Sequence, residues 1–194
     1  MIRIIYTLVP VQGALPFQWL TKDEQLYCQQ LAAKRLRQFC YGRALLRKHL
    51  CAALTLAVDD IRISLPSEQA PALTVNGRPY QLSISHSDAL IAVAYSAEHP
   101  VGLDVEMLKP RKDWQSLAAE FPALAGTADD IRAFYQRWTQ CEAYSKFSGE
   151  PLFPVLNKPL PSFPAFFCLP LGQYMLCLCY QHADTTISIT EECL

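Results

Sequence analysis

The sequence predicts an α+β fold with two similar lobes, each with a long helix packed on a small, mainly antiparallel sheet. Each half of the 194-residue chain reads as a strand, then a helix, then further strands. In the first half Asn76-Gly77, a strong tight-turn signal, separates two strand segments, which favours antiparallel pairing. We expect the lobes to meet near Glu98 to Val101, which gives an N-terminal lobe of residues 1–98 and a C-terminal lobe of residues 99–194.

The first lobe is expected to begin with a strand in the apolar start of "MIRIIYTLVPVQG". Thr21 and Glu24 of "TKDE" form a capping box, which predicts the start of a helical region. The region continues to about Leu54, with Gly42 as its candidate break. Short strands are then expected in "IRISL", "ALTV", "YQLSIS" and "LIAVAYS".

The second lobe opens with the strand "VGLDVE". Thr127 can cap a second long helix, "ADDIRAFYQRWTQCEAYSKFS", with two aspartates near its positive end, and Gly149 ends it. A proline-rich loop leads to strands in "AFFCL", "QYMLCLCY" and "TTISIT".

Composition excludes several classes of protein. Hydrophobic residues make up 51% and charged residues 18%, which is typical of a globular chain. The net charge of −1 gives no overall nucleic-acid signature, and no apolar run approaches the roughly 18–20 residues of a membrane span. The apolar N-terminus reads as a strand and not as a signal peptide. Eight scattered cysteines without a Cys-x-x-Cys motif favour reduced thiols in the cytoplasm.

Two carboxylates alternate with apolar residues in "VGLDVE". Because successive side chains of a strand point to opposite faces, Asp104 and Glu106 share one face with Gly102. Two anions so placed repel one another unless a cation lies between them. The pattern therefore indicates either a half-exposed strand with a solvated acidic face or part of a divalent-cation site.

The second helix offers a third carboxylate. Glu142 follows Trp138 by four residues, at the edge of the apolar stripe, and Lys146 follows four residues later. A surface Glu–Lys pair is one interpretation. The other is a magnesium ion held by Asp104, Glu106 and Glu142, since magnesium binds a few carboxylates together with water and substrate phosphate oxygens.

A metal of this kind implies a phosphate, and the first lobe offers basic residues. "KRLRQFCYGRALLRKH" contains six Lys or Arg and no acid, which fits either a solvated face or a phosphate site. Arg43, after the candidate break at Gly42, is the strongest candidate, and Arg78, past the Asn-Gly turn, is the second. "SISHS" places Ser85 and His86 at a strand end. Because the sequence has no Gly-x-Ser-x-Gly elbow, His86 is a better candidate for a hydrogen-bond donor to a phosphate than for the base of a serine hydrolase.

Together these motifs resemble the 4'-phosphopantetheinyl transferases of the monomeric, two-lobed, surfactin-synthetase-activator type. The specific pair is "GLDVE" followed by "WTQCEAYSK"; "GRALLR", "NGRPY" and "SISHS" precede them in the family's order. The resemblance covers roughly residues 35–147. Two features depart from the family pattern: Cys141 replaces the usual lysine before the glutamate, and the usual glycine-lysine segment after Lys146 is missing.

The resemblance implies a fold, a reaction and a set of residue roles. The implied fold is that of the family, with two pseudo-duplicated lobes. The implied reaction moves the phosphopantetheine arm of coenzyme A to a serine of an apo acyl or peptidyl carrier protein and releases adenosine 3',5'-bisphosphate. The implied magnesium ligands are Asp104, Glu106 and Glu142, the implied catalytic residues are Asp104, Glu142 and Lys146, and the implied coenzyme A contacts are Arg43, Arg78, Ser85 and His86.

Other roles stay open. The base that takes the serine proton is either Glu142, through a water, or Glu120. A basic patch of Lys109, Arg111 and Lys112, with Trp114 beside it, is the candidate docking surface for the carrier protein. We expect a monomer without nucleic-acid or membrane partners. The alternative functions are a magnesium-dependent phosphohydrolase of a nucleotide and a non-catalytic carrier-protein-binding relative.

Overall fold

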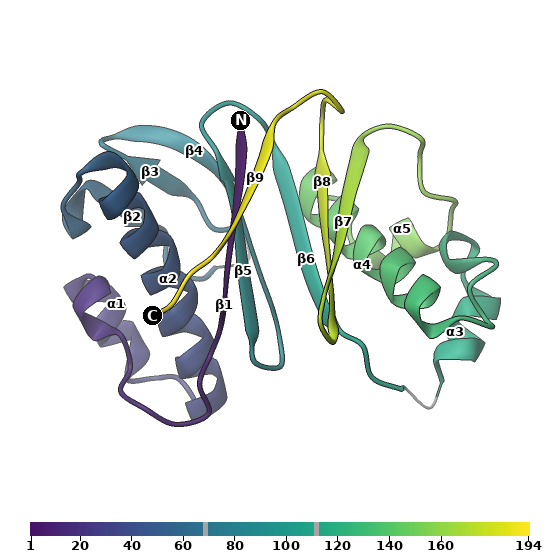
Figure 1. The fold of residues 1–194 in the computed structure, drawn as a ribbon, viewed down its shortest axis with the longest axis horizontal. Coiled ribbons are helices and arrows are strands. Elements are labelled where there is room, and N and C mark those ends of the chain that lie inside the picture. Colours follow the sequence, from purple (N-terminus) through teal and green to yellow (C-terminus); the bar gives the residue numbers. More distant parts are fainter. Residues whose placement is uncertain (68–69, 111–112) are drawn as a thin grey trace. The chain divides into compact units, whose positions relative to one another are not determined.

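The computed structural model is α+β, as predicted, and describes residues 1–67, 70–110 and 113–194. The chain divides into two compact units (Figure 1). Unit 1 contains Met1–Glu98 together with Thr186–Leu194, and unit 2 contains His99–Thr185. The end of the chain therefore belongs to unit 1, whereas the boundary drawn from the sequence groups it with residues 99–194.

Unit 1 contains a sheet with the strand order β2-β3-β4-β5-β1-β9. The expected tight turn is present, with positive φ angles at Asn76 (49°) and Gly77 (73°) between two antiparallel strands. The last strand, β9, pairs in parallel with β1, and this pairing places the end of the chain in unit 1. The strands are β1 (Ile2–Leu8), β2 (Ile61–Ile63), β3 (Leu73–Val75), β4 (Arg78–Ser87), β5 (Leu90–Ser96) and β9 (Ile187–Glu191).

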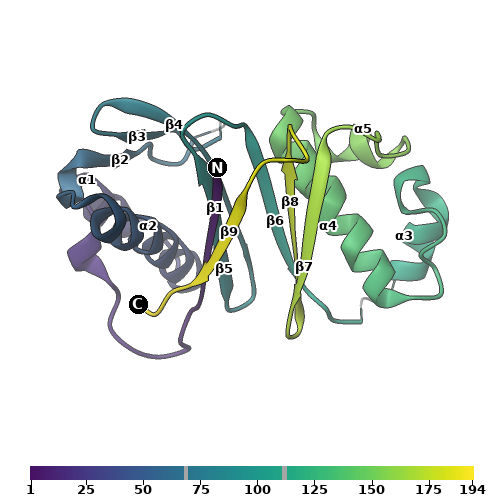
Figure 2. The ribbon, with the colours of Figure 1, turned by 45° about the horizontal axis from the view of Figure 1, so that its top comes forward.

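Two α-helices of unit 1 occupy the predicted helical region. These are α1 (Lys22–Cys28) and α2 (Ala33–Leu54), and the short 3-10 turns Phe17–Trp19 and Val58–Asp60 flank them. The capping box is confirmed: Thr21 Oγ1 accepts from the Glu24 amide, and Glu24 Oε2 accepts from the Thr21 amide. The break predicted at Gly42 is wrong, because α2 runs through it and the interruption lies at residues 29–32. Figures 1 and 2 show α2 lying along one face of the sheet, where Leu45, Leu46 and Leu50 enter the core.

Unit 2 contains a three-stranded antiparallel sheet with the order β6-β8-β7. Its long helix is capped by the Asp130 side chain, which accepts from the Arg132 amide, so the prediction of Thr127 as the cap is wrong. Gly149 ends the helix with φ 75°, as predicted. The elements are β6 (Val101–Met107), α3 (Trp114–Glu120), the 3-10 turn Pro122–Leu124, α4 (Ile131–Ser148), α5 (Leu152–Leu156), β7 (Ala165–Leu171) and β8 (Tyr174–Tyr180).

The cysteines differ from the expectation of reduced thiols. Cys168 and Cys177 are opposite one another on β7 and β8 and form a disulfide. Cys141 and Cys179 are buried free thiols of the same unit. Among the described residues, the structure contains no helix that is both long enough and apolar enough to cross a membrane.

Candidate functional site

The close approach of α4 to β6 in unit 2 depends on Gly102. A Cβ atom at this position would lie 2.1 Å from the Ala143 carbonyl oxygen and 2.5 Å from the Phe147 amide nitrogen. Any other residue would force the helix backbone away from the strand. Because Gly102 permits this contact, the carboxylates of β6 meet the polar side chains of the neighbouring turns of α4.

Three carboxylates from these two elements form one cluster. Asp104, Glu106 and Glu142 each offer a carboxylate oxygen, and these oxygens lie within 4.8 Å of one another. Asp104 is only 2% exposed, so a solvated acidic face does not describe this strand. The Lys146 ammonium donates to Asp104 Oδ1 at 2.7 Å and to the Leu103 carbonyl at 3.1 Å, so its ion pair crosses from helix to strand.

The electrostatics of the cluster favour a cation. Burial raises the pKa of Glu142 to about 7, the negative charges of Asp104 and Glu106 act in the same direction, and Lys146 opposes them. The Trp138 indole fixes one oxygen of Glu142 with a hydrogen bond of 2.9 Å from Nε1 to Oε1. Among the described residues, the Lys146 ammonium pairs with one of the three clustered carboxylates, and carboxylate oxygens are the ligands that magnesium prefers. The residues present therefore fit a hard divalent cation.

Two residues near this site in the sequence lie in other surroundings. Cys141 is fully buried in an apolar cluster with Phe134 and Tyr135, and burial raises the pKa of its thiol to about 12. The residue that departs from the family motif is thus a packing residue of unit 2. Glu120, the second candidate base, is exposed at the end of α3 and is not one of the clustered carboxylates.

A pocket of about 230 Å³ in unit 1 contains part of the predicted anion site. Arg43 and His86 both line it, together with Arg35, and no described lining residue is acidic. Arg35 Nη1 lies 2.9 Å from His86 Nε2. Sequence reasoning did not single out Arg35; its only signal was membership of the basic segment, which its neighbours share.

Arg43 reaches this pocket for a different reason from the one expected. Its side chain does not follow a helix break, and it is 5% exposed. Nη1 donates to Glu24 Oε1 at 2.6 Å and to the Ile63 carbonyl at 3.0 Å, and Nη2 donates to the Ser64 carbonyl at 2.6 Å. The guanidinium also lies over the Phe39 ring, 4.4 Å from its centroid.

The other predicted contacts lie outside the residues that line this pocket. Ser85 is buried in β4, and strand alternation places it on the face opposite to Ile84 and His86, which do line the pocket. Arg78 is exposed at the start of β4. The structure thus brings Arg43 and His86 together, but not Arg78 or Ser85 with them.

The predicted docking patch is described only in part. Lys109 is exposed, and its carbonyl accepts from the Tyr135 hydroxyl at 2.6 Å. Trp114 packs edge-on against Phe134 with ring centroids 5.7 Å apart, so it is largely a packing residue. Arg111 and Lys112 lie outside the described residues.

Sequence comparison finds relatives whose names agree with the motifs. The chain is 30% identical over 119 residues to the 4'-phosphopantetheinyl transferase AcpT of Salmonella typhi, which is 56% of this chain and 62% of that protein. It is 32% identical over 126 residues to the 4'-phosphopantetheinyl transferase HetI of a Nostoc species, which is 59% of this chain and 52% of that protein. AcpT of Escherichia coli K12 is 30% identical over 114 residues.

The chain thus matches between about half and three fifths of the length of these relatives. A scan against protein-family profiles finds no match. The similarity agrees with the resemblance drawn from the motifs: over the matched segment, the chain is similar to proteins named as 4'-phosphopantetheinyl transferases.

Proposed function

We propose that this chain transfers the 4'-phosphopantetheine arm of coenzyme A to a serine of an apo acyl or peptidyl carrier protein, with release of adenosine 3',5'-bisphosphate. The observation that carries the proposal is the cluster of Asp104, Glu106 and Glu142, of which Asp104 is buried and the other two are half-buried, with Lys146 beside it. The relatives named as 4'-phosphopantetheinyl transferases support it. The proposal extends to the family's pseudo-duplicated fold, with residues 1–98 in the coenzyme A lobe and a metal lobe that begins at residue 99.

In this proposal Asp104, Glu106 and Glu142 would hold Mg²⁺, which when bound would supply positive charge to offset that of the coenzyme A pyrophosphate. Lys146, whose ammonium pairs with Asp104 and is partly exposed, would stabilise charge on the attacked phosphate. The Trp138 indole holds the Glu142 carboxylate in one orientation. Glu142 accepts the serine proton through a water, since Glu120 is not part of the cluster.

The unit 1 pocket supports the second half of the proposal, which is coenzyme A binding. Arg35, Arg43 and His86 present positive or hydrogen-bonding groups to a space without described acids, which suits a phosphate. We retain Ser85 and Arg78 as proposed contacts of other parts of coenzyme A, because the family motifs contain them. The proposed docking surface for the carrier protein is the basic segment that begins at Lys109.

We further propose a monomer that acts in the cytoplasm. The scattered cysteines of the sequence support this location, whereas the Cys168–Cys177 disulfide does not.

One experiment tests the proposed reaction. The protein is incubated with coenzyme A, Mg²⁺ and several apo carrier proteins, and mass spectrometry reports whether a carrier gains one phosphopantetheine arm. We expect the gain on at least one carrier, and its loss when Mg²⁺ is chelated. Hydrolysis of coenzyme A without a carrier would support a phosphohydrolase instead. Carrier binding without transfer would support a non-catalytic relative.

A further inference from the structure

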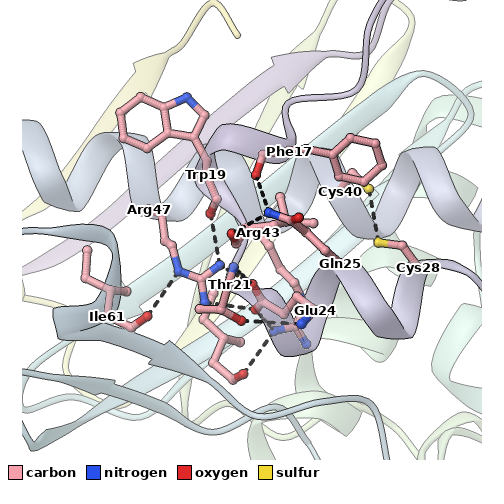
Figure 3. Close-up of polar contacts among 12 residues, drawn as sticks. Phe17, Trp19, Thr21, Glu24, Gln25, Cys28, Cys40, Arg43, Arg47 and Ile61 are labelled. Atoms are coloured by element: carbon pink, nitrogen blue, oxygen red, sulfur yellow. Dashed lines mark hydrogen bonds and ion pairs between the residues drawn. The ribbon is translucent and has the colours of Figure 1, made fainter.

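Unit 1 contains a buried ionic cluster beneath the coenzyme A pocket. Glu24 comes from α1, and Arg43 and Arg47 come from successive turns of α2 (Figure 3). Glu24 Oε1 accepts from Arg43 Nη1 at 2.6 Å and from Arg47 Nη2 at 2.8 Å, and Oε2 accepts from Arg47 Nη1 at 2.5 Å. One carboxylate against two guanidiniums leaves the cluster with a single net positive charge.

The two arginines differ in what else they contact. Arg47 is completely buried, and its remaining donors reach the backbone: Nε donates to the Ile61 carbonyl at 3.0 Å and Nη1 to the Trp19 carbonyl at 3.1 Å. These contacts join α2 to neighbouring segments. Arg43 is the member of the cluster that lines the pocket, with Arg35 and His86. Of the three cluster residues, Arg43 is therefore the one that connects Glu24 to the ligand site.

Arg43 also contacts the segment that leads into the pocket lining. It donates to the carbonyls of Ile63 and Ser64 at the end of β2, and the chain that follows contributes Pro66 and Ser67 to the lining. Burial alone would raise the pKa of Glu24, but the Arg47 hydrogen bonds and the nearby charges outweigh it, so the pKa is lowered and the carboxylate is ionised at neutral pH. An ionised carboxylate at 2.6 Å fixes the guanidinium before any ligand arrives.

We infer that Glu24 is a positioning residue of the coenzyme A pocket, which acts by holding the Arg43 guanidinium in place for a phosphate. The inference rests on the proposed function. A guanidinium already ordered in the free protein loses little conformational entropy when the ligand binds, and this preorganisation increases affinity. Glu24 does not contact the ligand in this account, and the capping box gives its helix a fixed start.

If Glu24 acted only through its negative charge, it would weaken coenzyme A binding, whereas a positioning role predicts that it strengthens binding. The two possibilities can therefore be separated by experiment. Glu24→Gln with Arg47→Met retains Arg43 and keeps the single net positive charge of the cluster, but it removes the carboxylate that holds Arg43. Arg47→Met alone leaves a neutral Glu24–Arg43 pair. If only charge mattered, the double variant would bind coenzyme A more tightly than Arg47→Met. If positioning matters, the order is reversed.

Calorimetric titration of coenzyme A, without metal or carrier protein, measures this order. We expect Arg47→Met to retain the wild-type Kd within about threefold and the double variant to bind about tenfold more weakly, the effect of one charge-assisted hydrogen bond. Binding by the double variant that equals or exceeds that of Arg47→Met overturns the inference. A wild-type protein that does not bind coenzyme A overturns the proposed function as well, and is recognised before any variant is compared.

Glu24→Asp keeps the test decisive if the double variant does not fold. It retains the charge and shortens the reach by one methylene, so we expect about threefold weaker binding of coenzyme A. A Kd equal to that of the wild type overturns the inference. In an Arg43→Met background the same substitution is expected to change the Kd no further, because Glu24 acts through Arg43. A further loss there would show a general structural effect and overturns the positioning role.

Discussion

Each of the two units contains a charged cluster, and the clusters have opposite composition. In unit 1 one carboxylate, that of Glu24, forms ion pairs with two guanidiniums, so its counterions are side chains of the protein itself. In unit 2 three carboxylates lie together, and among the described residues the ammonium of Lys146 pairs with one of them, Asp104. Burial acts to raise the pKa of both carboxylates. At Glu24 the interactions with Arg47, Thr21 and Arg43 outweigh burial and the pKa is lowered, whereas at Glu142 the charges of Asp104 and Glu106 add to burial and the pKa is raised to about 7.

The difference shows which cluster is complete. A buried carboxylate with excess cations is stabilised in its ionised form by the fold itself, so the unit 1 cluster contributes to folding. A group of carboxylates with too few cations opposes its own ionisation until a cation binds. The stability of the unit 2 cluster is therefore expected to depend on a bound cation, whereas that of the unit 1 cluster is not.

The largest expected effect is the loss of the unit 1 carboxylate. Glu24→Gln leaves two buried guanidiniums without a counterion, and breaking a buried pair in this way lowers the free energy of unfolding by about 3–5 kcal/mol. Urea denaturation measures it. The matched substitution in unit 2, Asp104→Asn in the absence of metal, is expected to change stability by less than about 1 kcal/mol, because it removes the repulsion among the carboxylates along with an ion pair whose lysine is about one third exposed. Equal losses in the two variants would contradict the contrast.

The next effect concerns activity. Asp104→Asn removes one of the three clustered carboxylates and preserves the side-chain volume, so we expect phosphopantetheine transfer to fall by about 100-fold or more, the effect of losing several kcal/mol of metal-dependent stabilisation. The rate of carrier-protein modification by mass spectrometry measures it. Glu120→Gln, an exposed carboxylate outside the cluster, is the control and is expected to leave the rate unchanged. Transfer by Asp104→Asn at the wild-type rate in limiting Mg²⁺ would rule out the metal assignment.

Magnesium itself should stabilise unit 2 and leave unit 1 unchanged. At ten times the dissociation constant, a ligand that binds only the folded state raises the free energy of unfolding by about 1.4 kcal/mol. Hydrogen exchange should show this increase as stronger protection in β6 and α4, with no change in α1 and α2. Chelation or Asp104→Asn should abolish it. Equal protection in both units would show a non-specific salt effect.

The sequence predicts local features of both clusters better than their long-range partners. Thr21 and Glu24 are separated by three residues, so the capping box follows from spacing alone. The two arginine partners of Glu24 lie 19 and 23 residues away along the chain, on a different helix. No periodicity of the sequence indicates that they contact Glu24. Asp104 and Glu106 share a face by strand alternation, which the sequence shows directly.

The errors have a common physical reason. Gly42 is a weak helix former, but packing of α2 on the sheet keeps the helix intact there. Thr127 and Asp130 are both good N-caps, and the sequence cannot show which of them the preceding 3-10 turn leaves available. The pairing of β9 with β1 joins the two ends of the chain, which no local pattern predicts. In each case tertiary contacts decided between locally acceptable alternatives.

The smallest effect is a pH dependence of stability that is specific to the unit 1 cluster. The pKa of Glu24 is lowered from 4.5, because the Arg47 hydrogen bonds, the charges of both arginines and the Thr21 amide together outweigh burial. The folded protein therefore binds fewer protons at this site than the unfolded chain just below pH 4.5, and stability is lost as the pH falls through the folded pKa.

One proton limits the slope to about 1.4 kcal/mol per pH unit. Urea denaturation of the wild type and of Glu24→Gln with Arg47→Met, measured from neutral to acidic pH, isolates this contribution from that of the other carboxylates. The two proteins should show parallel stability curves at neutral pH, and the wild type should lose stability more steeply below pH 4.5. Parallel curves over the whole pH range would mean that folding does not lower the pKa of Glu24. The arginines of unit 1 would then not stabilise the ionised carboxylate, and the contrast with the cluster of unit 2 would be wrong.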